Sequence, residues 1–155
     1  MRREETVDYN IKAAWHAIAR MYNQQASKYD ITMSMGFVLL NIHSDEGTPA
    51  TKIAPLMGLE ARSLTRLLKS MEEKGLIYRE ADASDKRLVR IVLTKEGKKK
   101  REGSKATVLR FNEAIREQID GQSLNIFFSV LQKINKIIEK NDIYDKIASL
   151  NEKKL

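Results

Sequence analysis

Residues 48–75 read TPATKIAPLMGLEARSLTRLLKSMEEKG, and this stretch decides the fold. Thr48 followed by Pro49 is typical of a helix start. A threonine hydroxyl can accept a hydrogen bond from a backbone N–H that has no partner within the helix, and proline at the first helical position removes no hydrogen bond that the helix would form. Gly58 can take the left-handed conformation at which a helix ends and the chain turns sharply. A second helix is predicted from Glu60 to Lys74, so the pattern indicates a helix-turn-helix.

The first helix of this pair has an apolar side and one unusual residue. Ile53, Leu56 and Met57 are predicted to face inward. Pro55 lies inside the helix, where the missing amide donor kinks or shortens a helix at a cost of about 3 kcal/mol. If the helix spans only Pro49 to Met57, Pro55 removes a single backbone hydrogen bond near the C-terminal end of the helix, and the cost in free energy is smaller.

The second helix has two opposite faces. Its apolar stripe consists of Leu64, Leu67, Leu68 and Met71. Opposite this stripe, at about 100° per residue, lie cations and hydroxyls, namely Arg62, Arg66 and Lys69 with Ser63, Thr65 and Ser70 on the flanks. Such a face fits the major groove of DNA, where arginine pairs with guanine and hydroxyls contact bases or phosphates. A solvated amphipathic helix would show the same pattern.

A hairpin with a charged tip follows Gly75. Leu76 to Glu80 and Leu88 to Leu93 are separated by the turn-forming run DASDKR at residues 82–87, and the second segment alternates as a half-buried strand does. Lys86 or Arg87 could enter a minor groove, while Asp85 is placed to hydrogen-bond a neighbouring arginine. Directly after a helix pair, this hairpin indicates a wing rather than an ordinary exposed turn.

Charge is concentrated in the same part of the chain. The net charge is +7; residues 59–105 hold 14 Lys/Arg and 8 Asp/Glu, a surplus of 6, whereas the rest holds 14 and 13, a surplus of 1. A phosphate-binding surface requires such a local excess. The basic run Lys98 to Arg101 is interpreted mainly as a solvated helix face.

Several other classes of function are excluded. No apolar run approaches the roughly 20 residues that cross a bilayer and no signal peptide begins the chain, so we expect a cytoplasmic protein without membrane contact. The 155 residues include no cysteine, which excludes disulfides and thiolate sites. His16 and His43 lie on separate segments, and we predict no metal and no cofactor, although Asp45 and Glu46 lie near His43. No catalytic motif is found, so an enzyme is not expected.

Helices are also predicted before and after the segment that holds the helix-turn-helix and the hairpin. They run from about Thr6 to Tyr29, from Met33 to His43, and from a cap at Thr94 onward. The last segment has apolar residues at spacings of three and four, typical of a coiled-coil seam of about two heptads, at Leu124, Phe127, Leu131, Ile134 and Ile138. Burial within one subunit would give the same pattern, but the total apolar stripe exceeds what one small core covers, which favours dimerisation through this seam.

The order of the predicted elements, with two helices before the reading motif and two after it, resembles the MarR (multiple antibiotic resistance regulator) family over nearly the whole chain, and four landmarks add to this resemblance. They are Gly58, Lys74-Gly75-Leu76-Ile77, Asp85-Lys86-Arg87 and Leu93-Thr94-Lys95-Glu96-Gly97. The resemblance implies a mainly α fold with a small β-hairpin, in which residues 1–155 form one domain. The winged helix-turn-helix lobe would occupy residues 30–94, and residues 1–29 and 95–155 would form dimerisation helices. Ala83 and Ser84 replace the more basic wing residues of many relatives.

The resemblance also implies a function. Such proteins are homodimeric bacterial transcription factors, often repressors of palindromic operators, and commonly bind a small aromatic or phenolic effector between the dimer and DNA lobes. By likeness, the residues that meet the major groove are Arg62, Ser63, Thr65, Arg66 and Lys69, and those of the wing are Asp85, Lys86 and Arg87. Trp15, Met33, Met35 and Phe37 could line an apolar cleft, but plain core is the commoner role and we assign them none. The alternative is a winged-helix module that binds another protein without sequence-specific DNA binding.

Overall fold

Two helices precede the helix-turn-helix, as the sequence predicts. In the computed structural model, which describes residues 1–140, a short 3-10 turn η1 (Arg3–Glu5) leads into α1 (Val7–Ser27), and α2 follows (Met33–Asn41). Thr32 caps α2, because its Oγ1 accepts a hydrogen bond from the Met35 amide at 3.2 Å. Helix α2 ends two residues before the predicted His43, since Ile42 is already extended.

The chain forms two compact units, Met1–Arg110 and Phe111–Leu155. The first holds η1 to β3 and most of α5 (Lys95–Gln118); the second holds the end of α5 and α6 (Gly121–Glu139). Within residues 1–140, no helix is long and apolar enough to cross a membrane. The predicted dimerisation region extends to residue 155, and its part beyond residue 140 lies outside the described residues.

The helix-turn-helix consists of α3 (Ala50–Met57) and α4 (Ala61–Glu73). Gly58 ends α3 in the left-handed conformation at φ 60°, and the amide of Leu59 then reaches back to the carbonyl of Ala54 at 3.2 Å. Gly75 ends α4 in the same way, at φ 68°. Both glycine stops agree with the sequence prediction.

The predicted start of α3 is wrong. Thr48 and Pro49 form a short strand, β1 (Thr48–Pro49), and the helix begins at Ala50 without a side-chain cap. The Thr48 hydroxyl instead accepts a hydrogen bond from the His43 amide at 2.9 Å and so closes the preceding loop. The residue pair that favours a helix start is used here for a loop and a strand.

The packing of α3 also differs in part from the prediction. Ile53 is fully buried and Met57 packs against the core, but Leu56 is 64% exposed and does not face inward. Pro55 lies within the last turn of the helix. The helix has only eight residues, so Pro55 removes one backbone hydrogen bond close to its C-terminal end. Helix α3 continues past Pro55 to Met57, and Gly58 follows as its cap.

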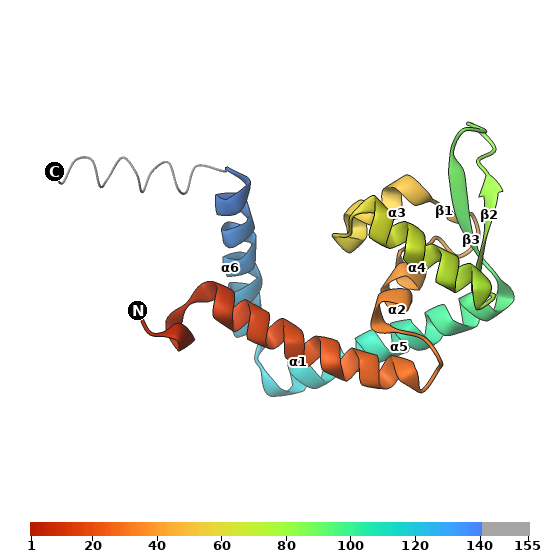
Figure 1. Ribbon diagram of the computed structural model, residues 1–155. Coiled ribbons are helices and arrows are strands. Elements are labelled where there is room, and N and C mark those ends of the chain that lie inside the picture. Colours follow the sequence, from red (N-terminus) through yellow and green to blue (C-terminus); the bar gives the residue numbers. More distant parts are fainter. Residues whose placement is uncertain (141–155) are drawn as a thin grey trace. The chain divides into compact units, whose positions relative to one another are not determined.

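The wing is part of a three-stranded antiparallel sheet in the order β1-β3-β2. The predicted hairpin is formed by β2 (Ile77–Ala81) and β3 (Val89–Leu93), with Ile77 opposite Leu93 and Tyr78 opposite Val92. The third strand, β1, pairs with β3 and was not predicted, because two residues give no alternating pattern. Figure 1 shows the hairpin projecting away from the helices of this unit.

One hydrophobic core joins α2, α3, α4 and the base of the sheet. The inner stripe of α4 is confirmed, since Leu64, Leu68 and Met71 are buried and Leu67 packs against them. Ile91 and Leu93 of β3 close the core from the other side, whereas Val89 near the hairpin tip is 43% exposed. Only the base of the wing is therefore fixed by apolar packing.

The junction between the wing and α5 depends on a close backbone approach. The Thr94 hydroxyl caps α5 by accepting a bond from the Gly97 amide at 3.0 Å, and donates to the carbonyl of Gly75 at 2.6 Å. A Cβ on Gly97 would collide with the carbonyl of Leu76. This contact explains why glycine follows the leucine-threonine pair at the start of this helix.

Candidate nucleic-acid interface

The outer face of α4 presents the predicted reading residues to solvent. The five residues are all exposed, namely Arg62, Ser63, Thr65, Arg66 and Lys69. Their exposure follows from the burial of the opposite stripe, because a helix whose leucines enter the core must turn the residues about 180° away outward. The Thr65 hydroxyl donates to the carbonyl of Ala61 at 2.8 Å, which leaves its oxygen free to accept a bond.

These cations are not neutralised by neighbouring acids. Of the ion pairs formed within residues 1–140, none uses Arg62, Arg66 or Lys69. An unpaired guanidinium keeps its five donors for a ligand, and a row of them attracts phosphate. The face therefore combines positive charge with hydrogen-bond donors on one rigid helix.

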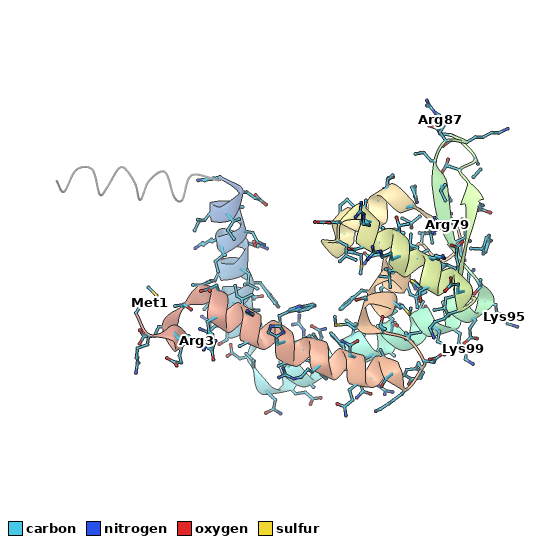
Figure 2. The ribbon with its side chains drawn as sticks, viewed as in Figure 1. Met1, Arg3, Arg79, Arg87, Lys95 and Lys99 are labelled. Atoms are coloured by element: carbon cyan, nitrogen blue, oxygen red, sulfur yellow. The ribbon has the colours of Figure 1, made fainter. Side chains whose placement is uncertain are left out.

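The wing tip carries a second cationic site. Figure 2 shows Arg87 at the tip of the hairpin, and its side chain is 90% exposed. Its Nε and Nη2 donate to the two carboxylate oxygens of Asp85 at 3.2 and 3.3 Å, as the sequence predicts. These bonds from Arg87 hold the pKa of Asp85 below its ordinary value. Lys86, beside Arg87, is exposed and takes part in none of the ion pairs within residues 1–140.

Two further ion pairs join α4 to its neighbours. Glu72 on α4 accepts from Arg79 on β2 at 2.9 Å, and Lys74 at the end of α4 donates to Asp30 at 3.0 Å. Asp30 has a positive φ of 56° in the turn between α1 and α2, and its bond from Lys74 lowers its pKa. Each pair is at least about one third exposed to solvent, so each stabilises the unit by at most about 1 kcal/mol.

Sequence reasoning missed the residue at the centre of the wing loop. Asp82 was recognised only as part of a turn-forming run, yet its side chain is buried and accepts bonds from Ser84 and Arg90. The hydroxyl and amide of Ser84 hold the pKa of Asp82 far below its ordinary value, and the Arg90 guanidinium adds to this effect. The available signal was Arg90, a cation at the second position of an otherwise apolar strand.

The first unit also contains an apolar cavity of about 310 Å³. Its walls come from α1, the turn at residues 29–31, α2 and α5, and include Tyr22, Tyr29, Met33, Phe37, Lys100 and Thr107. Of the four residues considered for a cleft, Met33 and Phe37 line it, whereas Met35 belongs to the core and Trp15 is 48% exposed. Lys100 Nζ donates to the Tyr29 carbonyl at 2.7 Å, so an ammonium group lies at the cavity wall.

The predicted seam lies on α6 in the second unit. Asp120 caps this helix, with its Oδ1 accepting from the Ser123 amide at 2.9 Å. Along the seam Leu124 is buried, Leu131 and Ile134 are half-buried, and Phe127 and Ile138 are more than half exposed. Further large apolar side chains on α6 are exposed as well, namely Ile126, Phe128, Val130 and Ile137. The helix thus has one broad apolar side, opposite a polar side that includes Asn125, Gln132 and Lys136.

Comparison with known proteins finds a family that resembles the winged lobe. Residues 31–89, from the turn before α2 to the first residue of β3, match the model of the MarR family. This segment, which holds the helix-turn-helix and most of the wing, is therefore similar to the MarR family. The MarR fold, mainly helical with a three-stranded wing sheet, agrees with the sequence prediction in class and adds one strand.

Relatives of this chain are regulators by name. The chain is 33% identical over 90 residues to the HTH-type transcriptional regulator TtmR of Methylorubrum extorquens, covering 58% of this chain and 46% of TtmR. It is 33% identical over 81 residues to SarZ of Staphylococcus aureus, covering 52% and 55% of the two chains. The alignments thus span about half the length of these curated relatives. Their names agree with the prediction that the chain is not an enzyme.

A solved structure extends the similarity beyond the matched segment. The S. aureus MepR–DNA complex has a TM-score of 0.78 at 26% identity, and the alignment covers 84% of this chain and 97% of MepR. The likeness therefore includes the helices that flank the winged lobe as well as the lobe itself.

Proposed function

We propose that this chain is a sequence-specific DNA-binding transcriptional regulator of the MarR family. The observation that carries the proposal is the outer face of α4, whose three cations are exposed and unpaired within the described residues. In this mechanism α4 enters the major groove, where Arg62 or Arg66 pairs with base edges, and the wing tip reaches the adjacent minor groove. The MepR relative was crystallised in complex with DNA, which supports the proposal.

The proposed regulator acts as a homodimer. The apolar side chains exposed on α6 support a partner on this helix, because a broad apolar helix face is normally packed against another element. A two-fold dimer sets its two α4 helices against half-sites about 34 Å apart, so the operator would be palindromic. Occupancy of an operator that overlaps a promoter would repress transcription, and this role places the protein in the cytoplasm.

The apolar cavity is the proposed site for a small aromatic or phenolic effector. Tyr22 and Phe37 pack edge to face with ring centroids 5.8 Å apart, and Tyr29 adds a third aromatic wall. The probe 1-anilinonaphthalene-8-sulfonate, an aromatic anion, should therefore fluoresce on binding the protein. Thr107→Trp should fill the cavity and abolish this signal, and an unchanged signal in that variant would place the probe elsewhere.

The DNA-binding proposal is tested by affinity for bulk duplex DNA across a salt series. Log affinity should fall linearly with log salt, because each neutralised phosphate releases counterions. On bulk DNA, where both cations would neutralise phosphates rather than read bases, Arg62→Ala combined with Lys86→Ala should reduce the slope by about 2, roughly one for each lost contact. Lys12→Ala, an exposed cation on α1, is the matched control and should leave the slope unchanged.

The protein-interaction alternative predicts the opposite result. A winged-helix module that binds only another protein would show negligible affinity for duplex DNA, or affinity without a steep salt slope and without sequence preference. Charge removal from α4 and the wing would then have no more effect than charge removal from α1.

A further inference from the structure

The wing loop is built around one buried carboxylate. Asp82 is 4% exposed, and among residues 1–140 it is the one charged side chain that is buried. Its Oδ1 accepts from the Ser84 amide at 2.8 Å, the Ser84 hydroxyl at 2.6 Å and the Asp85 amide at 3.3 Å. Its Oδ2 accepts from Arg90 Nε at 3.0 Å and Nη2 at 2.7 Å. Five bonds thus fix this carboxylate, three of them from the loop itself.

Arg90 connects this loop to a different part of the unit. Its remaining nitrogen, Nη1, donates to the carbonyls of Glu46 at 3.0 Å and Gly47 at 3.1 Å. The turn at Glu46 and Gly47 leads directly into β1 and α3. One guanidinium therefore joins the wing loop to the chain segment that starts the helix-turn-helix.

The turn can approach the strand closely only because residue 47 is glycine. Gly47 has a φ of 67°, and a Cβ there would lie 2.5 Å from the carbonyl oxygen of Ile91 and 3.2 Å from the Arg90 Cγ. Both the conformation and the space therefore exclude a side chain. The contact between the turn and Arg90 is thus built into the backbone of both segments.

Apolar packing does not fix the outer part of the wing. On β2 the residues from Tyr78 to Ala81 are exposed, and on β3 Val89 is exposed. The core cluster includes Ile77, Ile91 and Leu93 at the base of the hairpin but none of the outer strand residues. Together with the pairing of β3 with β1 and the ion pair between Arg79 and Glu72, the polar bonds of Asp82 and Arg90 therefore set the direction of the loop relative to the rest of the unit.

We propose that Asp82 and Arg90 are positioning residues for DNA binding. Their side chains hold the loop 83–87, with Lys86 and Arg87, at a fixed angle to α3 and α4, so that the wing and the reading helix meet DNA together. Neither side chain has to contact DNA itself. This inference rests on the proposed function, since it assigns the geometry of the same surface.

Two substitutions break the contact between Asp82 and Arg90 without changing the loop residues 83–87. Asp82→Asn retains one carbonyl oxygen that can accept from the loop amides. Its NH2 group would face the Arg90 guanidinium, and because both groups are donors, the hydrogen bonds between residues 82 and 90 are lost. In the wild type, three nitrogens of Arg90 donate four hydrogen bonds. Arg90→Lys keeps the charge but has one side-chain nitrogen, which cannot replace all four. The matched control is Asp30→Asn, which removes the carboxylate of an exposed ion pair remote from the wing.

The measurements are operator affinity, hydroxyl-radical protection of the minor groove, and the unfolding midpoint of each variant. Both wing variants should bind roughly tenfold more weakly, as expected for the loss of charge-assisted contacts. Minor-groove protection by the wing should disappear while the base preference set by α4 persists. Asp30→Asn should bind as the wild type does.

A double-mutant cycle with Arg87→Ala distinguishes positioning from general stabilisation. Arg87→Ala should weaken binding in the wild-type background and have little further effect in the Arg90→Lys background, because the wing is already displaced there. If Asp82→Asn fails to fold, the Arg90→Lys arm alone decides the result. Additive losses, or unchanged minor-groove protection in a folded variant, would overturn the positioning role alone. Absence of DNA binding by the wild type would overturn the proposed function with it.

Discussion

Arg66 lies at the middle of the exposed face of α4, while Leu64 and Leu68 on the other side of the helix are buried. This division between packing and exposed residues follows from the helical period, and so it could be predicted from the sequence alone. Individual side chains in irregular or short segments could not be predicted in the same way. Leu56 and Thr48 are examples, because a two-residue strand and an eight-residue helix leave their orientation to tertiary contacts.

Arg66→Ala tests whether the exposed face reads sequence. If this side chain pairs with a guanine, specific binding should weaken by about 1 to 3 kcal/mol and the preference at one position in each half-site should relax. Competition between operator variants measures this preference. An equal loss on all sequences would make Arg66 a phosphate contact instead.

Gly97→Ala tests the close approach between α5 and the start of the wing. The added Cβ would strike the Leu76 carbonyl, so the free energy of unfolding should fall by about 1 to 3 kcal/mol. Gly103→Ala in the same helix is the matched control, because nothing lies within 4 Å of its added Cβ. It should raise stability by up to about 1 kcal/mol through helix propensity, as denaturant titration would show. Equal effects of the two substitutions would contradict the packing described for Gly97.

At the scale of elements, the wing shows where sequence reasoning succeeds and where it stops. The hairpin and the Asp85–Arg87 bond were predicted, because turn residues and neighbouring opposite charges are local features. The Asp82–Arg90 pair and the bonds from Arg90 to Glu46 and Gly47 were not predicted, because their partners are separated by up to 44 residues. The exposed face of α4 depends on residues close together in the sequence. The bonds of Arg90 to Glu46 and Gly47 depend on residues far apart in the sequence.

The wing should also respond to acid. Asp82 and Asp85 both have a pKa below the ordinary value of 3.8, because Ser84 and Arg87 respectively donate bonds to their ionised forms. The unfolded chain therefore binds protons before the folded one does. The stability they contribute is fully present well above pH 3.8 and is lost as pH falls toward the folded pKa values. Asp82→Asn should make the free energy of unfolding less dependent on pH between about 5 and 3, and an unchanged slope would contradict the role of this carboxylate.

At the scale of the whole molecule, the apolar surface of α6 is the main feature that one chain leaves unexplained. A charged residue in the seam should separate the subunits, because it would place an unpaired carboxylate in an apolar interface. Leu131→Glu should therefore reduce the mass in light scattering from twice 17.8 kDa to 17.8 kDa. Gln132→Glu adds the same charge at the next, exposed position and should remain dimeric. A dimer mass in both variants would refute the placement of the interface at this seam.

Dimerisation and DNA reading together make one claim that a single experiment can test. The purified protein is used to select duplexes from a random-sequence library, and binding of the selected sequence and of bulk DNA is measured across a salt series. A dimeric reader of DNA sequence should enrich a palindrome with half-sites about one DNA turn apart, and its log affinity should fall linearly with log salt. No enriched sequence and negligible salt dependence would contradict it and favour a winged-helix module that binds another protein.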